Sequence, residues 1–320
     1  FDMSAYRTET GRRREFMKKS ASLKLNRVLS AVLFALGIAV LAVFILFAMA
    51  PDAIAPYNPK LSFDTFLEPS AEHILGTNNL GYDIFSELIH ASRTTLTVGL
   101  LSALVCTFIG TIAGVVAGCA KGLTGEILNG FINFFIIIPM LPLAIVIGAY
   151  LSGGALDTVL TISLIGWCGT ARAVKAKTEK VKNSPYIRLM RGLGYSRMRI
   201  LFRHVLPNVL DVAAARYITS VASCILLEST LGFLGVGAAG SMSWGVMINY
   251  AYKFGGLARG AYNWLLAPGV CIMLLELAFH FISRFIEDRL SAVQDGRSKK
   301  ASGGAVGADG YAVAGENSKG

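Results

Sequence analysis

The chain has 320 residues, a net charge of +10 and a mean hydropathy of +0.56. Hydrophobic residues make up 54% and charged residues only 16%, which excludes an ordinary soluble domain because its surface needs more charge. The apolar residues lie in blocks that approach or exceed the roughly 20 residues needed to cross a bilayer as a helix. Alternating segments of about 10 residues, which build spanning barrels, do not recur. The sequence therefore predicts an all-α integral membrane protein.

Six apolar blocks are long enough to be transmembrane helices. In chain order they cover residues 28–50, 94–120, 127–151, 156–176, 209–234 and 264–285. These limits predict a basic N-terminal segment (1–27), a first span (28–50), an external loop (51–93) and a five-helix core (94–290). Residues 291–320 are rich in Gly, Ala, Ser and Lys without apolar periodicity, which predicts a disordered tail.

Basic residues decide the orientation and argue against nucleic-acid binding. They concentrate in residues 7–27, in residues 172–203 and after residue 281, each time beside an apolar block. An excess of Lys and Arg marks cytoplasmic segments, so both termini are predicted to be cytoplasmic. No RNA- or DNA-binding motif accompanies the charge, and we predict no nucleic-acid partner. The five cysteines form no CxxC or Cys/His cluster, so no metal site is predicted.

The internal segment 177–208 is long for a membrane loop and has a pattern of its own. Ser184 is a candidate N-cap with Pro185 in the first helical position, and Gly194 can end that helix in a left-handed conformation. Ser196 can cap a second short helix, and Pro207 is expected where the chain turns back into the membrane. We therefore predict two short helices with a glycine hinge at the cytoplasmic face.

Both short helices are predicted to be amphipathic. Apolar residues at helical spacing form one stripe in each helix, namely Ile187, Met190 and Leu193, and then Met198, Leu201 and Phe202. A basic amphipathic segment fits a helix that lies on anionic headgroups as well as one that docks on a partner. The residues alone leave both alternatives open.

A resemblance favours the docking helix. The stretch 186–208 resembles the cytoplasmic signature of binding-protein-dependent ABC importer permeases, which reads E-A-A, three residues, Gly, and about nine residues to H-x-L-P-N. Gly194 matches the glycine, and His204, Leu206, Pro207 and Asn208 match the ending. The resemblance implies that the first short helix docks into a cleft of an ATPase. The residues that it implies for this coupling are Tyr186, Arg188, Met190, Gly194, His204, Pro207 and Asn208.

The sequence departs from that signature at its start. The E-A-A positions hold Arg188, Leu189 and Met190, so a guanidinium stands where the family has a carboxylate. Either the partner ATPase carries complementary acids, or the coupling differs in detail. Gly130 and Asn133 also stand where the family usually has Arg and Asp, and we expect that pair to be absent.

Further motifs narrow the resemblance to dipeptide, oligopeptide and nickel permeases. Residues 73–86 are similar to their external run H-x-L-G-T-x-x-x-G-x-D-x-x-S. Residues 228–237 resemble E-x-x-L-x-F-L-G-x-G, and residues 243–245 read S-W-G as in that class. The similarity extends in order over about residues 30–294. It implies a subunit that forms the channel of an importer for di- or oligopeptides, with nickel or another chelated metal as the alternative cargo.

The energy source must lie on other chains. No G-x-x-x-x-G-K-[ST] motif is present to hold ATP phosphates, and no catalytic set of side chains is apparent. We therefore predict a transport subunit that is not an enzyme and has no cofactor of its own. The resemblance implies a bacterial or archaeal plasma membrane, a second homologous permease, two P-loop ATPases that bind ATP and Mg²⁺, and an extracytoplasmic substrate-binding protein. An ATP-independent secondary transporter and a membrane enzyme are weaker alternatives.

Charged residues within the spans are candidates for the translocation path. Glu276 lies centrally in the last span and Glu228 near the external end of the fifth. An ionisable side chain there costs about 2.5–3.5 kcal/mol or more, so each needs a reason. A pore acid that attracts a cationic substrate is one reading of Glu276, and a buried structural carboxylate is the other. The external loop 51–93 is either a solvated connector or a contact for the binding protein.

Overall fold

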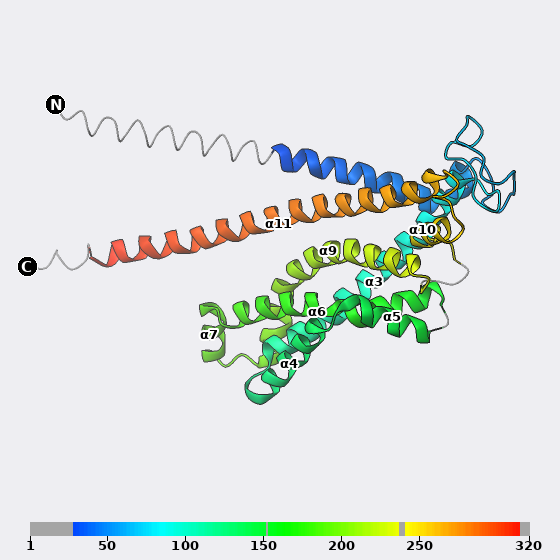
Figure 1. Ribbon diagram of the computed structural model, residues 1–320. Helices are drawn as coiled ribbons and strands as arrows, with labels where there is room; N and C mark the ends of the chain where they lie inside the picture. Colours follow the sequence, from blue (N-terminus) through cyan, green and yellow to red (C-terminus); the bar gives the residue numbers. More distant parts are fainter. Residues whose placement is uncertain (1–27, 152, 237–240, 314–320) are drawn as a thin grey trace, which may run out of the picture. The chain divides into compact units, whose positions relative to one another are not determined.

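The computed structural model describes residues 28–151, 153–236 and 241–313, with side chains up to residue 289. Figure 1 shows that these residues form helices joined by short loops, apart from one long loop after the first helix. Two isolated β-bridges occur in that loop. The larger of two compact units, Val32–Ile282, contains the sites considered below. In chain order the described helices are Val28–Met49, α2 (Pro51–Ile54), α3 (Ile84–Cys119), α4 (Gly122–Ile137), α5 (Met140–Tyr150), α6 (Ala155–Lys182), α7 (Pro185–Gly192), α8 (Arg197–Ile200), the π-helical turn η1 (Leu201–Val205), α9 (Leu206–Phe233), α10 (Trp244–Lys253) and α11 (Tyr262–Val313).

The structure has fewer helices that are long and apolar enough to cross a membrane than the six predicted. Within the described residues four do so, namely Val28–Met49, Ile84–Cys119, Arg197–Phe233 and Tyr262–Arg289. The pair of α4 and α5 makes a fifth if its two halves count as one span. α6 has 28 residues but carries several Thr, Ser and charged side chains. The fold is therefore an all-helical membrane protein with four or five candidate spans.

The third predicted span, residues 127–151, is not one straight helix. α4 ends at Ile137, α5 begins at Met140, and the two axes differ by 87°. Pro139 between them has no N–H to donate, and the residue before a proline is driven out of the helical region. Ile138 accordingly has φ −65° and ψ 127°, which is extended backbone. The apolar block thus contains a sharp bend that its composition does not reveal.

Glycines allow the second predicted span, α3, to pack closely on α6. A Cβ at Gly110 would lie 2.6 Å from the carbonyl oxygen of Trp167, and one at Gly114 would lie 2.6 Å from that of Ala171. A Cβ at Gly118 would likewise lie 2.6 Å from the Cβ of Thr178. Small residues at spacing i, i+4, i+8 let two backbones approach in a membrane. These three glycines therefore serve the packing of α3 on α6.

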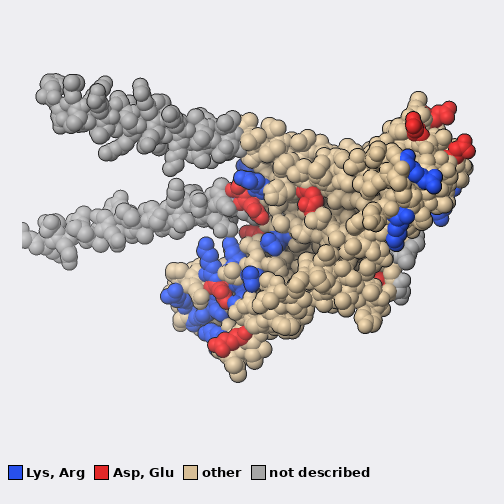
Figure 2. All heavy atoms as spheres, viewed as in Figure 1, with Lys and Arg blue, Asp and Glu red and all other residues tan. Residues whose placement is uncertain are grey.

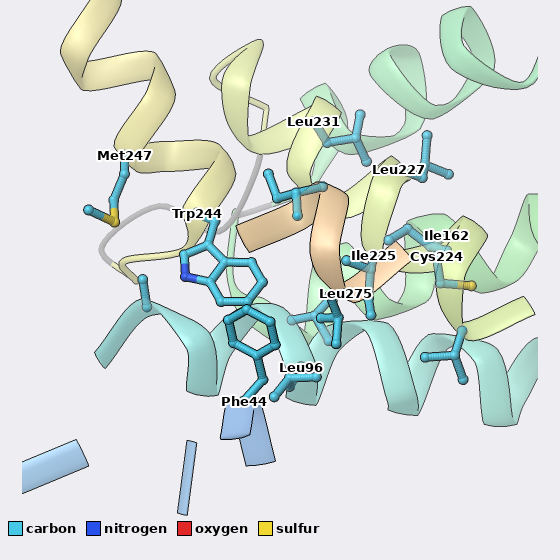
Figure 3. Close-up of a cluster of buried hydrophobic side chains, with 14 of the residues drawn as sticks. Phe44, Leu96, Ile162, Cys224, Ile225, Leu227, Leu231, Trp244, Met247 and Leu275 are labelled. Atoms are coloured by element: carbon cyan, nitrogen blue, oxygen red, sulfur yellow. The ribbon is translucent and has the colours of Figure 1, made fainter. Parts of the chain in front are cut away.

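A large apolar cluster joins α3, α9 and α10 with the first helix. The Trp244 indole is fully buried and lies against Phe44, with ring centroids 5.1 Å apart (Figure 3). Trp244 Nε1 donates to the carbonyl oxygen of Leu88 at 3.0 Å, which satisfies its polar atom. Ile225 and Leu231 of α9 and Leu275 of α11 complete this cluster. The tryptophan of the S-W-G motif is therefore part of this core.

The external loop before α3 is held by polar side chains of the 73–86 motif, which we call the polar latch: His73, Thr77, Asn78, Asp83 and Ser86. His73 Nδ1 lies 3.0 Å from Asp83 Oδ1, and both side chains are buried. Asp83 Oδ2 accepts from the Ser86 N–H at 2.8 Å, so Asp83 is the N-cap of α3. Gly76 (φ +81°) and Gly81 (φ +79°) adopt left-handed conformations in the turns of this loop.

The predicted tail differs from the structure. Residues 291–320 are predicted to be disordered, whereas α11 continues to Val313. A helix that is already nucleated adds one hydrogen bond for each further residue, so it can extend without an apolar face. The predicted N-terminal segment 1–27 and residues 314–320 lie outside the described residues.

Candidate functional site

The first short helix of the segment 177–208 forms as predicted. α7 begins at Pro185 and ends at Gly192, and Ser184 is its N-cap residue. The Ser184 hydroxyl donates to the carbonyl oxygen of Val181 at 2.6 Å instead of accepting from α7. Gly194 has φ +82°, the left-handed conformation expected at the end of a helix. The hinge between the two helices is therefore a glycine that another residue would strain.

The second short helix is not a separate element. α8 begins after Ser196, whose Oγ accepts from the Arg199 N–H at 3.3 Å, so the predicted cap is confirmed. The helix then runs without interruption from Arg197 to Phe233. The prediction that Pro207 marks a turn into the membrane is therefore wrong, because Pro207 lies in the first turn of α9.

A π-helical turn explains how the helix tolerates Pro207. The Leu206 N–H bonds to the carbonyl oxygen of Leu201, five residues earlier, at the end of η1. A proline in an α-helix has no N–H for the carbonyl four residues earlier, here that of Arg203, and its ring clashes with it. A wider turn directly before the proline relieves that clash. The L-P-N ending thus produces an irregular turn inside a long helix.

An apolar cluster attaches α7 and α8 to the ends of the long helices, and we call it the anchor cluster: Val115, Val174, Val181, Ile187, Ile200, Val205, Val209 and Ala213. Ile187 of α7 and Val209 of α9 are completely buried in it. The predicted stripes hold only in part, since Leu193 is 67% exposed and Met198 is 63% exposed. Ile200 takes the buried place in α8 that the sequence assigned to Met198. One buried isoleucine in each short helix therefore fixes it to the spans.

Basic side chains cap the C-terminal ends of α3 and α6. Arg188, which stands at the family's Glu position, donates from Nε (3.2 Å) and Nη2 (3.0 Å) to the carbonyl oxygen of Asn183, the C-cap of α6. Lys182 Nζ donates to the carbonyl oxygen of Gly118 at 2.7 Å, near the end of α3. Cations are favoured there because a helix C-terminus carries a partial negative charge. The sequence indicated Arg188 only as a docking residue. It did not indicate Lys182, although a cation in the last turn of a helix, here α6, is a known capping signal.

Most of the predicted coupling residues lie together on one surface. Tyr186 is 43% exposed and its ring lies edge-on to the His204 imidazole, with centroids 6.5 Å apart. Pro207 and Asn208 are exposed, and Asn208 Nδ2 donates to the carbonyl oxygen of His204 at 2.7 Å. Met190 is half-buried and packs against the anchor cluster instead. Figure 2 shows Lys and Arg gathered at the end of the molecule that carries α7, beside a broad band with few charges.

The external acid Glu228 is enclosed by hydroxyl groups. It is 4% exposed, and the Ser229 hydroxyl donates to its Oε2 at 3.2 Å. The hydroxyls of Ser243 and Thr95 are also hydrogen-bonded to it, so the carboxyl connects α9 with α10 and α3. A Cβ at Gly245 would lie 2.7 Å from the Ser229 Cα, which explains the glycine of S-W-G. These contacts are those of a carboxyl that holds three helices together.

Two further acids, Glu276 and Glu87, differ in environment. Glu276 is half-buried in α11, and His280 lies one turn later on the same helix. Glu87 was missed by sequence reasoning, although it is 2% exposed and its Oε2 accepts from Asn78 Nδ2 at 2.9 Å. Its signal was its place one residue after the 73–86 motif, in the first turn of α3. A carboxyl there completes the polar latch.

Two asparagines of α4 contact cations of α6, close to Gly130 and Asn133, where the family usually has Arg and Asp. Arg172 Nη2 lies 3.1 Å from Asn133 Oδ1, and Lys175 Nζ lies 2.6 Å from Asn129 Oδ1. Gly130 has no neighbour that a side chain would meet within 4 Å. The charged pair within α4 was expected to be absent, and instead two cations of α6 donate hydrogen bonds to neutral amides of α4.

Comparisons with known proteins place the chain in a family. Residues 110–292 match the family model of the binding-protein-dependent transport system inner membrane component. The chain is 31% identical over 263 residues to the di/tripeptide transport system permease protein DppC of Pseudomonas aeruginosa, covering 79% of this chain and 86% of that protein. It is 30% identical over 271 residues to the dipeptide transport system permease protein DppC of Bacillus subtilis, covering 84% and 82%. The glutathione transport system permease protein GsiD of Pectobacterium atrosepticum is 30% identical over 279 residues, with 87% and 90% covered.

A solved structure supports the fold. A chain of the MetNI methionine ABC transporter in an inward-facing conformation matches with a TM-score of 0.50 at 19% identity, covering 62% of this chain and 96% of that one. The family match covers more than half of the sequence and agrees with the helical architecture. The chain therefore belongs to the binding-protein-dependent transport system inner membrane components, as a multi-pass permease subunit of an ABC importer and not its ATPase.

Proposed function

We propose that the chain forms half of the channel of an importer for di- or oligopeptides in a bacterial plasma membrane. The observation that carries this proposal is the similarity of 30–31% over 79% or more of the chain to permeases named for di- and tripeptides. The other half is a second homologous permease. Two P-loop ATPases bind ATP and Mg²⁺, and an extracytoplasmic protein delivers the peptide.

In this proposal α7 transmits the closure of the ATPases to the spans. Ile187 ties one face of α7 to the anchor cluster, which reaches α3, α6 and α9. The opposite face presents Tyr186 and Leu189, which are 43% and 66% exposed. A helix that is buried on one side and free on the other can be pushed by a docked partner and can move the helices to which it is attached.

The proposed topology has six spans with both termini in the cytoplasm. α6, which is not among the four or five candidate spans, supplies the sixth. Its Thr158, Thr161, Ser163 and Thr170 are buried, and Gly110 and Gly114 of α3 pack directly on it. The outer face of α6 is apolar, with Leu156, Leu160 and Leu164 72%, 53% and 53% exposed, and polar side chains in membranes face the interior of the bundle.

We assign the two acids different parts in transport. Glu276 faces the translocation path and attracts the ammonium group of a peptide, whereas Glu228 keeps α3, α9 and α10 together near the outer gate. The half-buried position of Glu276 and the enclosed position of Glu228 support this division. The external loop, closed by the polar latch, is the proposed contact for the binding protein.

Uptake of a radiolabelled dipeptide tests the proposal. Cells that lack the chain should take up the peptide only when the gene is restored, and excess unlabelled dipeptide should compete while Ni²⁺ should not. Peptide uptake that is unchanged without the chain, or uptake of ⁶³Ni²⁺ that requires it, would contradict the proposed cargo. Purification of the tagged chain in mild detergent should recover the ATPases and the second permease, and transport by the chain alone would contradict the importer itself.

A further inference from the structure

A cavity with a basic wall lies beside α7, and the proposed function assigns it no ligand. Its volume is about 500 Å³, and it is enclosed by the end of α3, the start of α4, the end of α6 and the α8–η1 segment. Lys121, Lys182, Arg191 and Arg197 line it, together with apolar residues such as Ile200 and Leu201. No carboxylate is among its lining residues. A cavity of this size is suited to a small ligand or a headgroup.

The charge of this basic cavity is not neutralised by the protein. Lys182 and Arg191 donate to backbone carbonyl oxygens, of Gly118 at 2.7 Å and of Lys182 at 3.4 Å, which leaves their positive charges in place. Within the part of the chain that the structure describes, no ion pair involves any of the four cations. Four cations without an acid form a site for an anion.

An apolar stripe leads away from the cavity along α3. Ala120 lines the cavity, and Val116, Ile112 and Phe108 follow at intervals of four residues on the same face of α3. Their side chains are 50%, 51% and 65% exposed, respectively. Twelve residues of helix rise about 18 Å, and half the hydrocarbon core of a bilayer is about 15 Å deep. The stripe therefore matches one acyl chain that hangs from a headgroup in the cavity.

We propose that the basic cavity binds the phosphate of an anionic phospholipid, with an acyl chain along Val116, Ile112 and Phe108. Basic pockets between spans on the cytoplasmic side suit such headgroups. The side of the membrane rests on the proposed orientation, whereas the binding itself does not. A bound headgroup contacts Arg191 at the end of α7 and Arg197 at the start of α8, and so holds the hinge at Gly194 from both sides.

The test uses the full chain in mild detergent, with native mass spectrometry to count and titrate bound lipid. We expect one phosphatidylglycerol to bind tightly, and phosphatidylcholine with the same acyl chains to bind at least tenfold more weakly. The double variant Lys121→Gln/Arg197→Gln removes two cations whose side chains hold no backbone carbonyl oxygen within the described residues, and it should lose about tenfold in phosphatidylglycerol affinity. Lys182 and Arg191 stay unchanged because they cap helix ends.

A matched control makes the outcome specific. Lys180 and Arg203 are exposed on the same segment and do not line the cavity, so Lys180→Gln/Arg203→Gln should bind phosphatidylglycerol as the unchanged chain does. Equal losses in both double variants would overturn the proposal in favour of unspecific attraction. Displacement of the lipid by inorganic phosphate would make the site one for free anions. Loss of ATPase copurification by the cavity variant with lipid affinity unchanged would assign the cavity to an acidic side chain of the ATPase.

Discussion

The two ends of α3 are held in opposite ways. At its N-terminus the polar latch makes directional hydrogen bonds among buried side chains, with His73 and Asp83 3.0 Å apart. At its C-terminus one flexible side chain, Lys182, donates to the carbonyl oxygen of Gly118, the remaining contacts are the apolar ones of the anchor cluster, and an open cavity of about 500 Å³ lies next to it. Hydrogen bonds specify one geometry, whereas apolar contacts are non-directional and permit small shifts. We infer that the end of α3 beside the polar latch is fixed and that the end beside the anchor cluster can move.

The largest effect should follow from breaking the polar latch. Asp83→Ala removes the N-cap of α3, the acceptor for Ser86 and the partner of buried His73. We expect a loss of about 2–4 kcal/mol, from the cap and from the unpaired buried groups together. Thermal unfolding of the purified chain in detergent measures it. Asp64→Asn is the control because that side chain is exposed, and a similar loss in both variants would contradict the role of the latch.

Weakening the anchor cluster should impair coupling more than folding. Ile187→Ala empties a fully buried position in α7, which should weaken the attachment of α7 by about 2 kcal/mol or more. Peptide uptake should fall strongly, while the unfolding temperature changes less than in Asp83→Ala because the long helices remain packed. Leu189→Ala alters the exposed face of the same helix and should leave the unfolding temperature unchanged. An uptake rate that is normal in Ile187→Ala would show that α7 does not transmit the motion.

The hinge offers a smaller and sharper test with two neighbouring glycines. Gly194→Ala places a side chain at φ +82°, which costs about 1–2 kcal/mol and should displace α7 from α8. Gly192→Ala lies within α7 with no atom close enough to meet a Cβ, so it should be neutral or stabilising by about 0.4–1 kcal/mol. The unfolding temperature and the uptake rate should therefore both fall in Gly194→Ala, whereas neither should fall in Gly192→Ala. Identical behaviour would mean that the hinge conformation does not matter.

The smallest effect on stability is expected from changing Arg188, where the sequence departs from the family signature. Arg188→Glu replaces an exposed cation that caps α6, so the unfolding free energy should change by less than about 1 kcal/mol. Copurification of the ATPases should nevertheless decrease, since the variant places a negative charge against acids proposed on the partner. With Arg188→Gln, whose side chain is neutral, copurification of the ATPases should be intermediate between the unchanged chain and Arg188→Glu. Stronger copurification with Arg188→Glu would favour the usual contact of the family.

Local features of the segment 177–208 could be predicted from the sequence because they depend on residues that are near one another in the chain. Pro185 begins a helix, Ser196 caps one and Gly194 adopts a left-handed conformation wherever the chain is placed. The polar latch could be recognised as a motif but not explained, since its partners come from both sides of a loop. Its hydrogen bonds, such as that between Thr77 Oγ1 and the carbonyl oxygen of Asp64 at 2.6 Å, appear only when the loop closes.

The sequence by itself determined the membrane class, the apolar blocks and the basic segments beside them, because hydropathy and charge act along the chain. Only the tertiary structure decided the 87° bend at Pro139, the continuous helix through Pro207 and the polar enclosure of Glu228. A proline shows that a hydrogen bond is missing, but packing decides whether the helix breaks or widens into a π turn. Burial of a carboxyl likewise depends on which hydroxyl groups other helices bring to it.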